Sequence, residues 1–336
     1  MKIKNRIAIS VLVQFYEVEI IGEYLKSLKL ALEEIENPEN VLIDICFNTS
    51  QALEKIDKKQ ISLNKIKKKF YDTFYEYFPD YHFDTPKNIY RWEYSDDKVP
   101  YTIADYRRDF NNKYCDKVDI LMWGETDALI PHNTFQIIDN LHIQSLANNI
   151  PKYIATFGIC KMWDDSWKSI EHTEFTDKPF IVNDYSNWWS LKYTMTLEEM
   201  NKFNYKVEEL DVRMTTDLKF NGCGLVISSD IIKAGVNIPK AVWFVHEDSS
   251  FMLVLQKMLS VPQYIIKNIL IVHNRNHPKK RMYVKEGEGE TLNLRRRTNP
   301  WYVHANKMCE HNAYNLFNQS KIYTWEDVWE AVKNEK

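Results

Sequence analysis

Two carboxylates, Glu125 and Asp127, stand two residues apart in the segment Glu125-Thr126-Asp127. They directly follow a mostly apolar run at 118–123 that predicts a buried strand, and Pro131 then starts a predicted helix. In open parallel sheets, ligands bind where the strands end. Mg²⁺ and Mn²⁺ prefer oxygen ligands and need few protein carboxylates when substrate phosphates supply the rest. The pair therefore indicates either a divalent-metal site at a sheet edge or two solvated turn residues.

The segments around this pair alternate between strands and helices. The β-branched runs at 7–13 and 41–47 show no polar alternation, which is typical of central strands covered on both faces, and an amphipathic helix at 19–36 separates them. This order predicts a right-handed parallel crossover. We expect further strands at 88–94, 118–123, 153–160, 225–228 and 264–273, and helices at 51–78, 101–114, 132–146, 229–234, 248–259 and 325–332. The sequence thus predicts an α/β fold with a single Rossmann-type, mostly parallel sheet flanked by helices.

Composition narrows the function classes. With 336 residues, 44% of them hydrophobic, the chain is long enough for one large α/β domain with an elaborated C-terminal part. The net charge of −3 gives no global basic footprint for nucleic acid. Five scattered cysteines without a CxxC favour a reducing compartment over a zinc site or a disulfide framework. The apolar run at 7–13 is too short to cross a bilayer, so we expect a soluble, cytoplasmic protein without a membrane span.

In its context, the acidic pair resembles the DxD motif of GT-A glycosyltransferases of the family-2-like group: a strand, Glu-x-Asp, three residues and a proline. The resemblance covers residues 7–275 through the order and spacing of several segments. It implies a GT-A-like fold in which Glu125, Thr126 and Asp127 hold the metal, Mn²⁺ or Mg²⁺, and the diphosphate of a nucleotide-sugar donor. Because Glu125 stands where the family has Asp, Asp127 is the firmer metal ligand.

Three further segments resemble the donor-binding part of these enzymes. The first strand and the turn after it place Val13, Phe15 and Glu17 beside the nucleotide, and Asn48 after the second strand lies at the base or ribose. Asn48 replaces an acidic turn and can both donate and accept hydrogen bonds, so the base stays open although a UDP-sugar is favoured. Arg108 would neutralise the diphosphate through its planar fork, unless it lies on an exposed helix face.

Two later segments resemble the acceptor side and the catalytic base. Gly222, Cys223 and Gly224 lie in a loop that resembles the glycine-containing acceptor loop of the family. Asp248 opens a helix, and the resemblance implies that it accepts the proton of the acceptor hydroxyl in an inverting transfer, with Glu247 in that role if the register slips by one. A carboxylate at a helix N-terminus can instead cap the helix. A retaining reaction on the same scaffold stays open.

A histidine and a basic segment complete the predicted site. His273 ends the late strand where several GT-A enzymes carry a metal-binding histidine, and His277 is the alternative. Basic residues at 275–281 would form a lid over the diphosphate or else a solvated tail. Trp163 and Trp188 would stack on the acceptor or form a local apolar cluster.

These assignments divide the chain into a donor-binding half at 1–160, an acceptor-binding and catalytic half of the same domain at 161–285, and a basic, helical extension at 286–336. The predicted activity is metal-dependent transfer of a hexosyl or pentosyl group to a hydroxyl of a glycan or, as in phages, of a hydroxymethylated DNA base. For DNA, lysines at 65–69 and arginines at 295–297 would contact phosphates, although the net acidity argues against it.

Other function classes fit the residues less well. A non-catalytic nucleotide-sugar-binding module is the main alternative, because Glu125 and Asn48 both depart from the family pattern. A nucleotidyltransferase is disfavoured because no glycine-rich loop follows the first strand, and a dehydrogenase because no GxGxxG follows any strand. The donor sugar, the acceptor and the oligomeric state are left open.

Overall fold

The computed structural model describes residues 1–80, 88–159, 194–216, 218, 222–276, 279–285 and 299–335. One sheet runs through these residues in the strand order β3-β2-β1-β4-β9-β6-β10-β5, with β7 and β8 also paired to β10. The strands are β1 (Ile7–Gln14), β2 (Val41–Asn48), β3 (Ile89–Tyr94), β4 (Ile120–Trp123), β5 (Ala128–Leu129), β6 (Ile154–Ile159), β7 (Thr194–Met195), β8 (Val212–Thr215), β9 (Val226–Ser228) and β10 (Gln263–Asn274).

Strand β1 lies at the centre of the parallel part of the sheet. It pairs in parallel with β2 and β4, and β3 continues the parallel order beyond β2. β6 and β10 form a second parallel pair, and β9 joins the two parts by running antiparallel to both β4 and β6. β1 and β2 are buried along nearly their whole length. The prediction of an α/β fold with a mostly parallel sheet flanked by helices is therefore confirmed.

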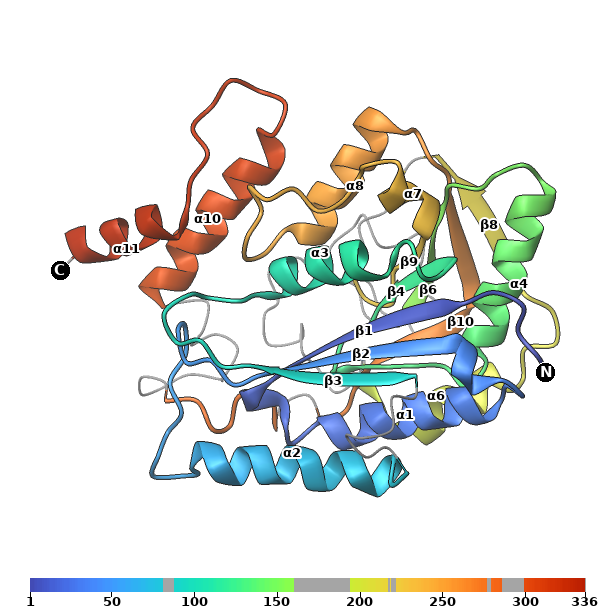
Figure 1. Ribbon diagram of the computed structural model, residues 1–336, viewed down its shortest axis with the longest axis horizontal. Helices are drawn as coiled ribbons and strands as arrows, with labels where there is room; N and C mark the ends of the chain where they lie inside the picture. Colours follow the sequence, from blue (N-terminus) through green and yellow to red (C-terminus); the bar gives the residue numbers. More distant parts are fainter. Residues whose placement is uncertain are drawn as a thin grey trace.

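Helices cover both faces of this sheet: α1 and α2 lie on one side, and α3, α7 and α8 on the other (Figure 1). No helix within the described ranges is both long and apolar enough to cross a membrane. The helices are α1 (Ile21–Glu33), α2 (Leu63–Tyr77), α3 (Ile103–Tyr114), α4 (Thr134–Ala147), α6 (Leu197–Asn204), α7 (Ser229–Lys233), α8 (Glu247–Met258), α10 (Pro300–Tyr314) and α11 (Trp325–Asn334), with short 3₁₀ turns η1 (Phe15–Glu17) and η2 (Pro38–Asn40).

Several segments differ from the sequence prediction, and β5, β7, α6 and β8 are elements that it did not contain. The expected helix at 51–78 begins only at Leu63, because the residues before it form turns and Ile56 bridges to Val284. The tail contains α10 in addition to the predicted helix near its end. The buried stripe of α10 repeats every four residues but consists mostly of small side chains, which give a weak hydrophobic signal: Trp301, Ala305, Cys309 and Ala313.

The C-terminal helices α10 and α11 lie together at one end of the molecule (Figure 1). Their aromatic side chains pack on the segment that precedes α8: the rings of Trp325 and Trp243 lie 4.4 Å apart, and those of Trp301 and Phe244 lie 5.6 Å apart. The extension at 286–336 therefore supports the chain where it enters α8. Both predicted halves, 1–160 and 161–285, supply strands to the one sheet.

Candidate functional site

The ends of β1, β2, β4 and β10 meet at one cavity of about 340 Å³. That volume lies within the usual range of small-molecule sites. Leu53, Phe244 and Val245 form an apolar part of its wall. Residues that the sequence singled out and that line the cavity are Phe15, Glu17, Asn48, Glu125, Thr126, Asp127, Glu247 and His273.

The turn that carries the acidic pair requires glycine at its start. The Gly124 amide donates to the Ser10 carbonyl at 2.9 Å, and a Cβ on Gly124 would lie 2.6 Å from that same oxygen. No side chain fits so close to backbone, so only glycine lets the chain leave β4 directly against β1. The chain then turns so that Glu125 and Asp127 face the cavity.

Pairing between β5 and β10 brings His273 to the acidic pair. His273 lies opposite Ala128, and the Asn274 amide donates to the Asp127 carbonyl at 2.7 Å. One ligating atom from each of Glu125, Asp127 and His273 lies within 4.8 Å of the other two. An octahedral ion with bonds of about 2.1 Å needs ligands roughly 3 Å apart when adjacent and about 4.2 Å apart when opposite. The three residues could therefore hold a divalent cation after a small closure.

A lysine contacts the acidic pair from the segment after β10. Lys280 Nζ donates to Asp127 Oδ2 at 3.0 Å and to Glu17 Oε1 at 2.8 Å, and its side chain is 20% exposed. Burial alone would lower the pKa of Lys280, but the negative charges of Asp127 and Glu17 outweigh burial and raise it. Lys280 is therefore a charged ammonium, and it is the residue of the predicted basic segment that lines the cavity.

The segment at 279–285 is fastened along its length. The Arg281 amide donates to the Tyr16 carbonyl at 2.8 Å, and its guanidinium pairs with Glu54 at 2.6 Å and lies 4.8 Å from the centre of the Tyr16 ring. Two further backbone hydrogen bonds join the segment to residues 55–57. These contacts fix the backbone at Lys280. The position of its ammonium can therefore change only through rotation of its own side chain.

A buried arginine forms the second charged centre of the site. Arg107 is 1% exposed and donates through Nη2 to Glu125 Oε1 at 2.7 Å and through Nη1 to Glu247 Oε1 at 2.6 Å. It also donates to the Gly222 carbonyl at 3.0 Å and stacks on the Trp123 ring. We call Arg107, Glu125 and Glu247 the Arg107 clamp, because one planar fork holds both carboxylates at a fixed separation.

Glu247 opens α8 and faces the cavity. The preceding residue, His246, has φ of 64°, and this left-handed conformation turns the chain just before the helix. Such a conformation costs a non-glycine residue about 1–3 kcal/mol, and strain of this kind is typical of functional sites. Burial raises the pKa of Glu247 to about 7, with Arg107 opposing the rise and Asp248 adding to it. A carboxyl group that titrates near neutral pH suits a general base.

Asp248, the preferred base in the sequence, does not line the cavity of the described residues. Its Oδ1 accepts a hydrogen bond from the Ser249 amide at 2.7 Å, in the first turn of α8. The arrangement found is the alternative register, with Glu247 as the residue that faces the cavity.

The predicted acceptor loop and Val13 lie behind the cavity wall and do not face the cavity. A Cβ on Gly222 would lie 2.9 Å from Arg107 Nη1, so glycine leaves room for the clamp. Cys223 is buried in the core, and Gly224, with φ of 67°, bonds through its amide to the Trp123 carbonyl. Val13 is wholly buried in the core. None of these four lines the cavity of the described residues.

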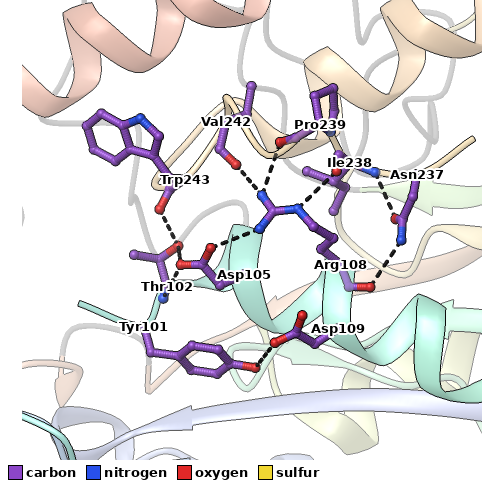
Figure 2. Close-up of polar contacts among 10 residues, drawn as sticks. All are labelled: Tyr101, Thr102, Asp105, Arg108, Asp109, Asn237, Ile238, Pro239, Val242 and Trp243. Atoms are coloured by element: carbon purple, nitrogen blue, oxygen red, sulfur yellow. Dashed lines mark hydrogen bonds and ion pairs between the residues drawn. The ribbon is translucent and has the colours of Figure 1, made fainter. Parts of the chain in front are cut away.

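Arg108 does not line the cavity of the described residues and instead holds the 237–242 segment (Figure 2). Its guanidinium donates to the carbonyls of Ile238 and Pro239 at 3.0 and 3.1 Å and pairs with Asp105 at 2.9 Å. The expected diphosphate contact therefore does not fit Arg108, and Arg107 is the arginine at the site. The helical periodicity of the sequence could have distinguished the two arginines, because Arg107 shares the buried side of α3 with Ala104 and Asn111.

Asn48 lines the cavity but is partly engaged. Its Nδ2 donates to the Tyr101 carbonyl at 2.8 Å, and its Oδ1 accepts from the Ser50 amide at 3.0 Å. Asn48 thereby holds two neighbouring wall segments together. Trp163, Trp188 and His277 lie outside the described residues, as do the arginines at 295–297.

Searches against protein-family models and against curated protein sequences found no match to this chain.

Proposed function

We propose that the protein is a metal-dependent glycosyltransferase that moves a sugar from a nucleotide diphosphate donor to a hydroxyl acceptor. The observation that carries this proposal is the gathering of Glu125, Asp127 and His273 with Glu247 around one cavity at the end of the parallel strands. Such a site combines a place for a metal-bound diphosphate with a base close by. The sequence resemblance to GT-A glycosyltransferases supports the same function.

The residues divide the work of the reaction. Asp127, Glu125 and His273 would hold Mn²⁺, which when bound offsets the negative charge of the leaving diphosphate. Glu247 takes the proton of the acceptor hydroxyl while the acceptor oxygen bonds to the anomeric carbon. The bond from that carbon to the diphosphate breaks, and its electron pair leaves with the diphosphate. Attack from the side opposite the leaving group inverts the anomeric centre.

Arg107 is a positioning residue in this scheme. It touches Glu125 on the metal side and Glu247 on the base side, so the distance between the two functions is set by one rigid group. Fixed geometry of this kind lowers the cost of bringing reacting groups together. Without Arg107, the two carboxylates would repel each other in a buried setting.

The charge distribution favours a glycan or another small hydroxyl compound over DNA as the acceptor. Of the four lysines at 65–69, three are ion-paired with carboxylates, which removes most of the positive field that DNA phosphates would need. These pairs are Lys67–Glu93, Lys68–Asp72 and Lys69–Glu19.

Calorimetry with UDP in the presence of Mn²⁺ tests the donor site. We expect Asp127→Ala to weaken binding by about 100-fold or more, because it removes both a metal ligand and the partner of Lys280. Asp116→Ala is the matched control, since Asp116 is an exposed carboxylate outside the cavity, and it should bind like the wild type. Undiminished binding to Asp127→Ala would contradict the metal role.

A transfer assay separates the enzyme from the binding module. We expect the wild type, supplied with Mn²⁺ and a panel of nucleotide sugars, to release nucleoside diphosphate from at least one donor. Glu247→Gln should bind that donor but release far less. A wild type that binds a donor without releasing diphosphate in the presence of any hydroxyl acceptor would support the non-catalytic alternative instead.

A further inference from the structure

Lys280 pairs with Asp127, the carboxylate that a bound metal would need as a ligand. Its ammonium contacts Asp127 Oδ2 at 3.0 Å, while Asp127 also belongs to the group of three potential ligands. An ammonium and a divalent cation cannot both take the same carboxylate without strong mutual repulsion at a site so little exposed. Binding of a metal at Asp127 therefore requires that Lys280 find another partner.

Glu17 gives Lys280 a pivot for such a change. Lys280 contacts Glu17 Oε1 at 2.8 Å, and the other carboxylate oxygen of Glu17 accepts from the Gln14 amide at 2.8 Å, which holds Glu17 in place. The four-carbon stem of lysine lets the ammonium swing about this contact. The backbone cannot follow, because Arg281 anchors the segment to Glu54. A short movement of the ammonium alone can therefore release Asp127.

A bound diphosphate would give the displaced Lys280 ammonium a new negatively charged partner. Bound at the metal, it would bring negative oxygens into the cavity that Lys280 lines. The ammonium would then exchange one carboxylate for a phosphate oxygen, and Asp127 would be left to the metal. Mn²⁺ alone offers no such replacement partner.

Resting on the proposed function, we propose that Lys280 couples the two ligands: it opposes metal binding at Asp127 when no nucleotide is present and strengthens diphosphate binding once the metal is in place. Metal and nucleotide then bind as a unit. By linkage, each ligand raises the affinity of the other by the same factor.

Calorimetry on Lys280→Met tests this coupling, with Mn²⁺ alone and then with UDP at saturating Mn²⁺. We expect Mn²⁺ alone to bind about tenfold more tightly than to the wild type, and UDP to bind about tenfold more weakly, within the usual range of coupling between sites. The opposite signs of the two changes are the signature of the coupling. A defect in folding would weaken both ligands together.

Two control variants make the result specific. Lys279→Met removes the neighbouring, exposed lysine and should leave both affinities unchanged. Lys280→Arg keeps the charge and should keep Mn²⁺ binding weak in the absence of nucleotide. Both should unfold at temperatures close to that of the wild type.

The outcomes separate this proposal from the proposed function. If the wild type binds UDP with Mn²⁺ but Lys280→Met binds Mn²⁺ no more tightly, the coupling is overturned and the donor site stands. If Lys280→Met gains Mn²⁺ affinity but neither protein binds a nucleoside diphosphate, the competition at Asp127 is supported and the proposed donor is overturned.

Discussion

Two cations pair with carboxylates that line the same cavity, and the structure holds these cations very differently. Arg107 is 1% exposed, lies in the middle of α3 and makes three polar contacts and one ring contact. Lys280 is 20% exposed, lies in a connecting segment and contacts two carboxylates. The contacts of Arg107 fix its position, whereas Lys280 can exchange its contacts when a ligand enters the cavity.

The chemistry of the two side chains matches these surroundings. Guanidinium is planar and reaches two acids at once in a fixed fork, whereas an ammonium on a flexible stem exchanges partners readily. The Arg107 clamp therefore sets the geometry between Glu125 and Glu247. Lys280 instead adjusts the charge at Asp127 to whatever is bound. The predictions below test this division.

The largest effect is expected on the rate of transfer, from a change at Glu247, the proposed base. Glu247→Gln should lower the rate of transfer by about 10²–10⁴-fold, the usual contribution of a general base. Because only the ionised carboxyl accepts a proton and burial raises the pKa of Glu247 to about 7, the wild-type rate should rise with pH up to about 7 and then level off. The variant should lack this rise. Rates measured from pH 5 to 9 check both points.

Asp248→Asn is the matched control for the base. Asp248 lies next in the chain but bonds to the Ser249 amide and does not line the cavity, so this variant should keep most of the activity. The rise of the rate with pH should persist but move to lower pH, because the charge of Asp248 no longer raises the pKa of Glu247. A greater loss in Asp248→Asn than in Glu247→Gln would return the role to Asp248.

Removal of Arg107 should have the next largest effect, on stability. Arg107→Met leaves the buried Glu247 and the partly exposed Glu125 without their cation, which should lower the free energy of unfolding by about 3 kcal/mol, the lower end of the loss for a broken buried pair. The loss should be smaller at pH 5 than at pH 8, because burial raises the pKa of both carboxyls and protonation relieves their repulsion. Urea denaturation at the two pH values measures this.

Lys280→Met provides the comparison for Arg107→Met. The Lys280 side chain is 20% exposed against 1% for Arg107, although the carboxylates that it contacts are buried. We therefore expect a loss of about 1.5–3 kcal/mol, as for a hydrogen bond to a charged group. Addition of Mn²⁺ should recover part of it. If Lys280→Met lowered the free energy of unfolding more than Arg107→Met, Lys280 rather than Arg107 would be the cation with the fixed, structural role.

Much of the fold and part of the site could be predicted from the sequence. The strands at 7–13 and 41–47 could be predicted because each is an apolar, β-branched run interrupted by a single polar residue, Ser10 or Asp44. Glu125, Asp127 and His273 could be grouped because each ends a strand or follows one, and strand ends meet at one edge of a sheet. Their shared use of a metal stays a prediction.

Local geometry decided what the pattern could not. Arg107 and Arg108 are neighbours that point about 100° apart on a helix, and only the folded structure shows that Arg107 is the one that pairs with carboxylates of the cavity wall. Glu247 faces the cavity in place of Asp248, and the left-handed turn at His246 just before the helix leaves no mark in the hydrophobic pattern. Lys280 reaches Asp127 only through tertiary contacts of the 279–285 segment, which leave no periodic signal.

The smallest effect, and the sharpest test of separate roles, is expected at Gly222. A Cβ there would lie 2.9 Å from Arg107 Nη1 and 3.3 Å from Asp248 Oδ2, so Gly222→Ala should push on the clamp and cost about 1–3 kcal/mol by overpacking. Because Arg107 then holds Glu247 less well, the pH dependence of transfer should shift upward. Binding of Mn²⁺ alone should change far less than in Lys280→Met, because the clamp reaches the group of potential ligands through Glu125 and leaves the Lys280–Asp127 pair in place. If Gly222→Ala changed Mn²⁺ affinity as strongly as Lys280→Met does, the two cations would have to be treated as one coupled unit.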